Sequence, residues 1–517
     1  MKPGDDSDFE EQLRGVELRH PPEEWRDLLL RKPRSRSFSQ TRATSPRRKW
    51  SRRSLQGLAV LLSVLGLGTA AANWWAAGVR HGAAESFRLR GHLIDEAKFQ
   101  VALPPDGENF AMIPLFVALR EETALPGNPD YPLRTRLQKM AGDERGRSVK
   151  LPKPRGDLDL EAVRTGLGLR GTAAAMLEQY DRQHADVLNE LKEGMKRPSA
   201  VLPPRLDIND PEKVFRATSG GILALRYLST GLALRAGLAL EAGRPEVALE
   251  SILINRRLSD LVMSEPTAVG QLLGWAFDGS HLHPLQKGIA AGAWDAAQLA
   301  TLREAWKPRD TRETVARTLN IEGAAMAILY DHSKSNRALL MEVQGSGTGL
   351  VNQLKWKALP GFWFDSQAAG VLGRTERALE VIREEGPLQN WWDERSIFAN
   401  AAPDLLSQAF QIEEYSEGPL VQTLAKKGSR AAVDEAMVRL ACRLAEYKLA
   451  TGSFPATLDS LPAEETLDPL SGEPFRYRLE EGGFVLYSIG PDKVDDGGLF
   501  LPKRLMMSPH DQPDWVW

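Results

Sequence analysis

Few residues of this chain have the types and spacing that chemistry needs. The eight histidines form no His-Glu-x-x-His pair, which is the common zinc-protease signature, and no Gly-x-Ser-x-Gly elbow has partners in order. His281 and His283 stand two apart in "SHLHP", but zinc needs further ligands, so we expect a surface turn there. The single cysteine, Cys442, lies on the inner face of an expected helix without a nearby base, and we expect it to be a buried small hydrophobe. These residues predict no reaction centre.

Three aspartates cluster near the end of the chain in "GPDKVDDGG", namely Asp492, Asp495 and Asp496. Taken alone, this stretch is typical of a solvated acidic turn in which Gly497 and Gly498 end a strand. Whether these carboxylates act together as a binding site depends on the helices and strands that position them.

The composition predicts a folded protein of more than one unit. The chain has 517 residues, of which 42% are hydrophobic and 26% charged, and its net charge is −3. At about 100–200 residues per domain, this length predicts two or three units. The charge is unevenly placed, because residues 31–53 hold ten Lys or Arg and no acid. Such a block is normally solvated, so residues 1–53 predict a disordered basic tail.

An uncharged segment follows this block directly. Ser54–Val79 would form a helix about 39 Å long, which is enough to cross the hydrocarbon core of about 30 Å. Trp74 and Trp75 near one end suit a membrane interface, and the basic residues at the other end predict a cytoplasmic N-terminus. We therefore expect a single-pass anchor at residues 54–79 in a bacterial inner membrane, with the later residues extracytoplasmic. A cleaved signal peptide and a twin-arginine export signal are the alternatives. The lipid bilayer accounts for the basic block, so we expect no nucleic-acid partner.

Residues 80–429 carry mainly helical periodicity, which predicts an extracytoplasmic domain of antiparallel helix pairs. In "LALEAGRPEVALESI", Gly243 can close one long helix and Pro245 can open the next. The fold class we expect is thus mainly α.

Residues 430–498 have a different texture, which predicts a small α+β unit. A helix with Val433, Met437, Leu440 and Leu444 on its inner side stops at Gly452. "PFRYRL" and "GFVLYSI" then predict two strands joined by "EEGG" as a β-hairpin. Residues 499–517 are expected to form a C-terminal tail.

This C-terminal unit resembles the C-terminal region of the major pseudopilins of type II secretion. The likeness covers about 65 residues, and the pseudopilin processing site before the apolar helix is missing. The whole chain resembles a set of single-span bacterial membrane proteins of no known activity. The residues that carry the likeness are Tyr447, Gly452, Phe454, Pro455, Leu458, Leu461, Asp468, Pro469, Gly472, Pro474, Tyr477, Tyr487, Ser488, Gly490, Pro491, Asp492, Asp495 and Asp496.

The resemblance implies a calcium site. In the pseudopilins the corresponding loop binds calcium and fixes the hairpin, and Asp492, Asp495 and Asp496 match acidic positions of that loop. Calcium takes six to eight oxygen ligands, which clustered aspartates and backbone carbonyls can supply. The residues alone predict no cofactor, and calcium at the acidic loop is the one candidate that the resemblance implies.

The function expected from these features is a membrane-anchored, non-catalytic role in contacts with a protein partner that the sequence does not identify. One alternative is an extracytoplasmic hydrolase whose site is assembled from distant residues. The other is a divergent component of a type II secretion or pilus-like machine.

Overall fold

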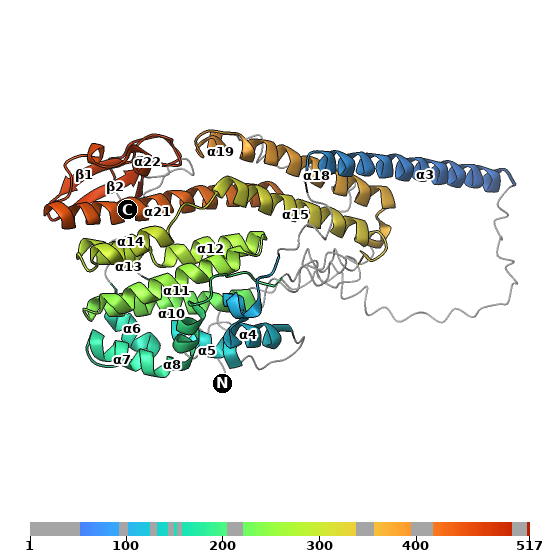
Figure 1. Cartoon of the computed structure of the whole chain (residues 1–517). Coiled ribbons are helices and arrows are strands. Elements are labelled where there is room, and N and C mark those ends of the chain that lie inside the picture. The colour runs from blue at the N-terminus through green and yellow to red at the C-terminus, as the bar shows by residue number, and fades with distance from the viewer. Residues whose placement is uncertain are drawn as a thin grey trace, which may run out of the picture. The chain divides into compact units, whose positions relative to one another are not determined.

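The structure is a computed structural model that describes residues 52–92, 102–124, 132–142, 149–151, 158–203, 221–337, 356–393, 417–498 and 514–517. Residues 1–51 of the expected basic tail and 499–513 of the expected C-terminal tail lie outside them. Residues Gly66–Trp517 form one compact unit. That unit is mainly helical, as predicted, with a small sheet near the C-terminus (Figure 1).

Helix α3 (Arg52–Leu89) contains the predicted apolar segment. It is long and apolar enough to cross a membrane, and its apolar side chains are exposed, as at Leu67. The helix is longer than the predicted 54–79, because the chain meets no helix-breaking geometry until Gly91, whose φ is +77°. Among the described residues this is the one helix that could span a membrane, which agrees with the prediction. Its C-terminal extension lies against the helical body.

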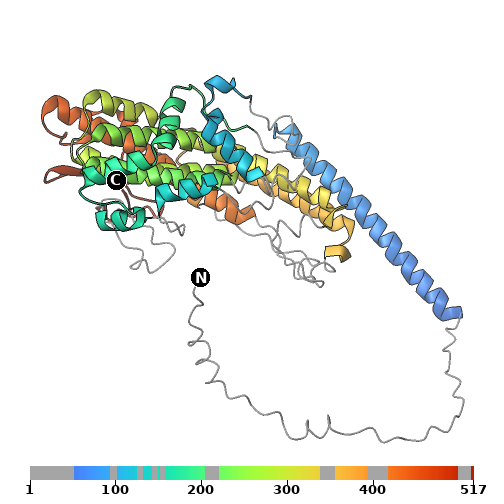
Figure 2. The ribbon, with the colours of Figure 1, turned by 90° about the horizontal axis from the view of Figure 1, so that it is seen from below.

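The body is built from helices that pack side by side (Figures 1 and 2). Its shorter N-terminal elements cover one side of the longer helices that follow. The elements are η2 (Asp106–Glu108), η3 (Phe110–Met112), α4 (Pro114–Ala124), α5 (Pro132–Ala141), α6 (Leu160–Leu167), α7 (Ala173–Gln183), α8 (Ala185–Gly194), α10 (Gly221–Glu241), α11 (Pro245–Met263), α12 (Ala268–Ser280), α13 (Leu282–Ala290), α14 (Ala296–Ala305), α15 (Thr311–Ser333), α18 (Gly361–Arg383) and α19 (Asn390–Asp393).

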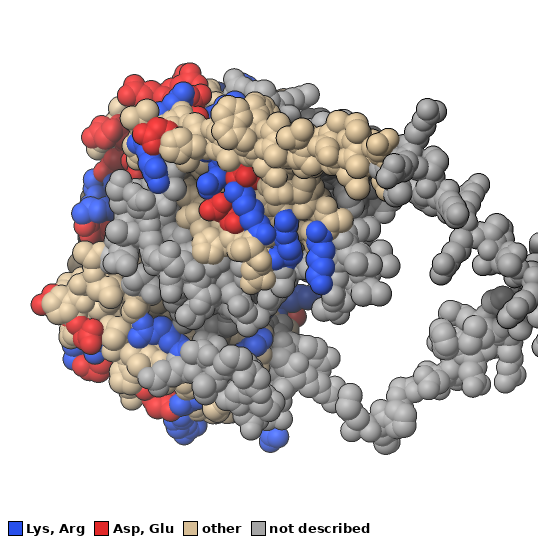
Figure 3. All heavy atoms as spheres, turned by 90° about the vertical axis from the view of Figure 1, so that its right-hand side faces the viewer, with Lys and Arg blue, Asp and Glu red and all other residues tan. Residues whose placement is uncertain are grey.

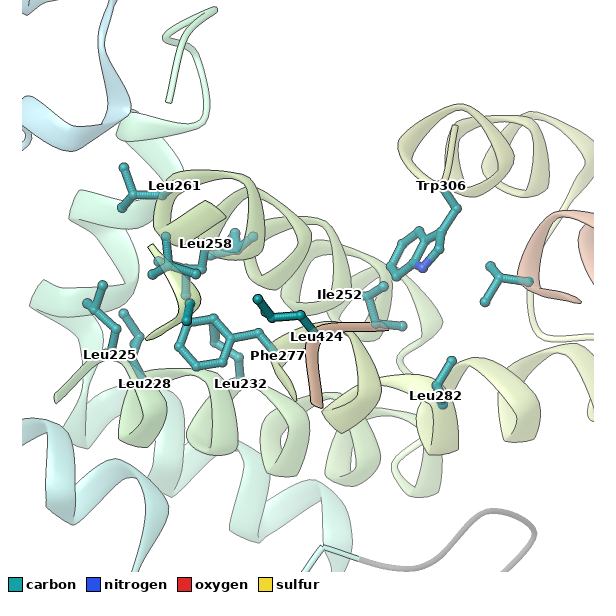
Figure 4. Close-up of a cluster of buried hydrophobic side chains, with 14 of the residues drawn as sticks. Leu225, Leu228, Leu232, Ile252, Leu258, Leu261, Phe277, Leu282, Trp306 and Leu424 are labelled. Carbon is teal, nitrogen blue, oxygen red and sulfur yellow. The ribbon is translucent and has the colours of Figure 1, made fainter. Parts of the chain in front are cut away.

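The predicted turn between two long helices is confirmed at α10 and α11. Gly243 has φ +67°, a left-handed conformation that closes α10, and Pro245 is the first residue of α11. Part of the core lies between these helices and α12. Figure 4 shows side chains from five helices meeting there, together with Trp306, which follows α14: Leu225, Leu228, Leu232, Ile252, Leu258, Leu261, Phe277, Leu282 and Leu424.

A second pair, α15 and α18, is antiparallel along its length. Gly323 of α15 lies so close to α18 that an added Cβ would come within 2.2 Å of Thr375, and Arg312 at the start of α15 donates to the carbonyl of Ile382 at the end of α18, 3.0 Å away. A glycine at this contact lets the two backbones approach closely.

The C-terminal unit begins with α21, which runs from Glu417 to Thr451. The expected boundary between residues 429 and 430 therefore lies inside a helix. η4 (Leu458–Ser460) and α22 (Ala463–Thr466) follow, and then the predicted hairpin of β1 (Arg476–Glu480) and β2 (Gly483–Ser488).

The sheet has one strand more than the predicted hairpin. β3 (Trp515–Val516) pairs antiparallel with β2, with Tyr487 opposite Val516 and Ser488 opposite Trp515. The backbone N–H of Trp517 also donates to the carbonyl of Leu486, 2.8 Å away. The last residues of the expected tail thus complete the sheet.

Candidate functional site

The acidic loop, which we define as residues 492–496, follows β2. Asp495 Oδ1 accepts hydrogen bonds from the hydroxyl of Tyr487 at 2.9 Å and from the N–H of Gly497 at 2.9 Å. Its Oδ2 lies 3.3 Å from Arg476 Nε. Asp492 Oδ1 accepts from the N–H of Val494 at 3.1 Å. Both carboxylate oxygens of Asp495 thus already contact donors of the protein.

A further aspartate that the sequence reasoning missed lies beside this loop. Asp514 is buried, and its Oδ2 accepts from the N–H of Gly498 at 2.7 Å. Burial raises the pKa of Asp514, and the charges of Asp495 and Asp496 add to that rise. Its position at the edge of β3, more than ten residues downstream, gave no local signal.

The three predicted ligands and Asp514 do not form a ready-made metal centre. Among the described residues, no three His, Cys, Asp or Glu side chains lie together as a possible ligand set. The calcium site therefore remains a prediction from the resemblance, and binding would require Asp495 to exchange Arg476 and Tyr487 for the ion.

The motif residues outside the loop have clear structural roles. Asp468 is buried and accepts from Ser488 at 2.6 Å, from the N–H of Leu470 at 2.8 Å and from Ser471 at 3.1 Å. The Tyr477 hydroxyl donates to the carbonyl of Pro455, 2.8 Å away. These bonds hold the "DPLSG" turn and the end of α21 against the sheet, because buried polar groups are stable only when they are paired.

The isolated candidates for catalysis are buried. Cys442 has no exposed surface, as predicted, and burial raises the pKa of its thiol to about 12. The expected surface turn at His281 and His283 is wrong, because both are buried at the junction of α12 and α13. His281 Nδ1 lies 2.9 Å from the hydroxyl of Ser280, and burial lowers its pKa to about 4. A fully buried imidazole has no access to a substrate.

A buried charge network joins four elements of the body. Arg256 of α11 binds Asp278 of α12 at 2.7 Å and Glu435 of α21 at 2.9 Å. Arg309, in the connection between α14 and α15, binds the same two carboxylates at 2.6 and 2.9 Å. Arg309 also binds Asp260 at 2.6 Å. The neighbouring carboxylates outweigh burial and raise the pKa of Arg309. The network thus fixes α21 against the core, with two guanidiniums shared among three carboxylates.

A cavity of about 390 Å³ opens beside this network, between the end of α11 and the starts of α12 and α15. Asp260, Arg309 and Gln271 line it, and Arg317 is exposed there without a partner among the described residues. No His or Cys is among the described residues of its wall. The guanidinium of Arg309 is already matched by the carboxylates of Asp260, Asp278 and Glu435.

Helix α3 is attached to the body by a second set of charges. Arg80 lies 3.1 Å from Asp331 of α15, and its Nε lies 2.9 Å from Asp365 of α18 as an ion pair that is not aligned for a hydrogen bond. Farther along, Arg90 lies 2.6 Å from Glu376 and also pairs with Glu380. Asp365 additionally pairs with Lys334. This contact could not be predicted from local sequence, since Arg80 and Asp331 lie 251 positions apart (331 − 80).

On the same stretch of α3, apolar side chains are covered by the body. Ala76 and Phe87 have no exposed surface, whereas Trp74 and Trp75 are 81% and 63% exposed. One helix therefore has an exposed apolar part and a docked part.

No known protein family, no curated protein and no solved structure matches this chain.

Proposed function

We propose that this protein is anchored in a bacterial inner membrane by α3 and that its helical body works outside the cytoplasm through contacts with a protein partner, without catalysis. The observation that carries the proposal is the apolar part of α3, which is long enough to span a bilayer and exposed along its length. An exposed apolar surface of this size in water would be strongly unfavourable, so it requires a lipid or protein environment.

The charge distribution supports the orientation. The ten basic residues between 31 and 53 precede the apolar part, and the positive-inside rule keeps such a block in the cytoplasm. The body, which follows the apolar part, then lies on the other side. The bacterial inner membrane is proposed because the residues of the C-terminal unit resemble those of bacterial pseudopilins.

The C-terminal unit supports a role in protein contacts. Its helix, turn and hairpin lie in the order that the resemblance to pseudopilins implies, and motif residues Asp468 and Ser488 bind each other within it. On the same grounds, a divergent component of a type II secretion or pilus-like machine is the second candidate. Co-purification with a secretion apparatus would favour it, whereas a clean monomer after detergent extraction would count against it.

The hydrolase alternative would need ionisable groups that converge in a cleft and stay available. The groups that converge in the described residues, around Arg309, are matched with one another. We therefore prefer a binding role.

Two measurements on intact cells and membranes test the anchoring. Protease added to spheroplasts should remove the body, while a cytoplasmic marker protein stays intact. Carbonate washing of membranes should leave the full chain in the pellet. A body that stays protected in spheroplasts refutes the orientation, and a chain that carbonate strips from membranes refutes the anchor.

The partner role is tested by chemical crosslinking in the membrane, followed by purification of the tagged full chain and mass spectrometry. A defined, reproducible partner that is absent from a control expressing the tagged residues 1–92 alone would support contacts by the body. Crosslinks to lipid only would count against them.

A further inference from the structure

The register of α3 against the body determines where the membrane-crossing part of this helix ends. An added Cβ at Gly361, the first residue of α18, would come within 3.1 Å of the Asn73 side chain, so α18 begins at the level of Asn73. From Ser54 to Asn73 is about 20 residues, or about 30 Å of helix, which equals the hydrocarbon thickness. The body therefore begins where the hydrocarbon ends.

The end of the body at this level is formed by the C-terminus of α15 and the N-terminus of α18. Arg80 contacts both helices there, and α18 then runs in the same direction as α3, since Arg90 reaches Glu376. The exposed rings of Trp74 and Trp75 lie at the same height on α3. Indole rings favour the headgroup region of a bilayer. Beneath this end lie buried aromatic rings in edge contact, namely Tyr330, Trp356, Trp363 and Phe364.

Two basic side chains at this end have no acidic partner among the described residues. Arg337 is half-buried and lies over the ring of Phe364, 4.0 Å from its centroid. Its Nη1 is buried and has no hydrogen-bond partner in the described part of the chain. Lys357, next to Trp356, is exposed and likewise has no partner among the residues that the structure describes. Arg80 and Lys334 share Asp331 and Asp365 nearby, so the four basic groups named here meet two carboxylates among the described residues.

Figure 3 looks at this end of the molecule and shows Lys and Arg side chains gathered beside uncharged surface. We infer that this end of the body rests on the membrane surface, where Arg337 and Lys357 bind the phosphates of anionic phospholipid headgroups. The inference rests on the proposed anchoring by α3. A cation next to an anionic membrane surface contributes roughly a fivefold change in association. The guanidinium also suits phosphate because it donates two parallel hydrogen bonds.

The full chain in lipid nanodiscs allows a direct test, since its own cysteine does not interfere. Cys442 is fully buried and stays a thiol at neutral pH, so a maleimide fluorophore labels an introduced cysteine instead. Ala358→Cys places the label at the inferred contact, and Glu464→Cys places it in α22, at the opposite end of the body (Figure 1). Lipids with a nitroxide on the headgroup should quench the label at 358 several-fold more than the label at 464.

The charge requirement is tested by comparing nitroxide-labelled phosphatidylglycerol with nitroxide-labelled phosphatidylcholine. At position 358, phosphatidylglycerol should quench preferentially, and Arg337→Gln and Lys357→Gln should each lower that preference about fivefold. Arg377→Gln is the matched control, because Arg377 is exposed, has no partner among the described residues and lies about 24 Å along α18 from Gly361. The Lys357 variant keeps the test valid if the Arg337 variant folds poorly, because Lys357 is exposed.

The outcomes separate the two proposals. A chain that stays in the discs while the label at 358 is quenched no more than the label at 464 refutes the surface contact and leaves the anchoring intact. Equal quenching by both lipids, or equal effects of all three charge variants, refutes the binding of anionic headgroups. A chain that does not enter the discs refutes the anchoring as well.

Discussion

Two buried histidines should make the body sensitive to mild acid. His184 packs edge-on against Tyr180, with ring centroids 4.7 Å apart, and burial, assisted by Arg136, lowers its pKa to about 4. His281 has no exposed surface, and burial lowers its pKa to about 4 as well. Both imidazoles are therefore neutral in the folded protein at pH values where an exposed imidazole is charged.

The sign and size of the effect follow from proton linkage. Above about pH 6.5 each histidine is neutral in both states and contributes nothing. Below that pH the unfolded chain binds a proton that the folded chain does not, so the free energy of unfolding falls as pH falls. The slope is about 1.4 kcal/mol per pH unit for each histidine, and the loss reaches about 3 kcal/mol each near pH 4.

Urea unfolding of the full chain in detergent micelles, followed by tryptophan fluorescence from pH 7.5 to 4.5, measures this slope. Carboxylates also titrate in this range, so the informative quantity is the difference between variants. His184→Gln and His281→Gln should each reduce the slope by about 1.4 kcal/mol per pH unit. His81→Gln is the control, because His81 is exposed. If the slopes of the buried variants equal that of the wild type, these imidazoles are not neutral in the folded state and the reasoning fails.

Three other predictions follow from the charge network and the C-terminal unit. Glu435→Gln should lower the free energy of unfolding by about 3 kcal/mol, because it takes one carboxylate from the buried Arg256 and the half-buried Arg309. The exposed control Glu464→Gln should change it by less than about 0.5 kcal/mol, and equal effects in urea would contradict a structural role for the network. Asp468→Asn should speed proteolysis of the C-terminal unit in the full chain, since the turn loses its charged acceptor; unchanged cleavage would exclude that role. If the acidic loop binds calcium, the melting temperature should rise with Ca²⁺ and fall with chelator. An unchanged melting curve would refute calcium binding.

The parts of the fold that depend on local pattern could be predicted from the sequence. The turn at Gly243 and Pro245 follows from backbone preferences of two residues. The inner face of α21 follows from helical spacing, and its predicted residues Val433, Met437, Leu440 and Leu444 are buried. The apolar segment of α3 follows from composition and length.

What could not be predicted depends on contacts between distant residues. Arg256 and Glu435 are 179 positions apart, and nothing in the sequence around either indicates the other. The same holds for Arg80 with Asp331, and for β3, whose two residues are too few to show a strand period. His281 seemed exposed because polar residues and a proline surround it, but packing between α12 and α13 buries it.

Helix α21 belongs at once to the body and to the unit that resembles a pseudopilin. Its residue Glu435 completes the charge network, while its C-terminal end leads into the turn that Asp468 holds. Cutting the chain before residue 430 would take the Glu435 carboxylate from Arg256 and Arg309 and uncover the core. The unit is therefore not a portable module: it should melt in a single cooperative transition with the rest of the body, and grafting it onto another protein would require a new surface along the whole helix.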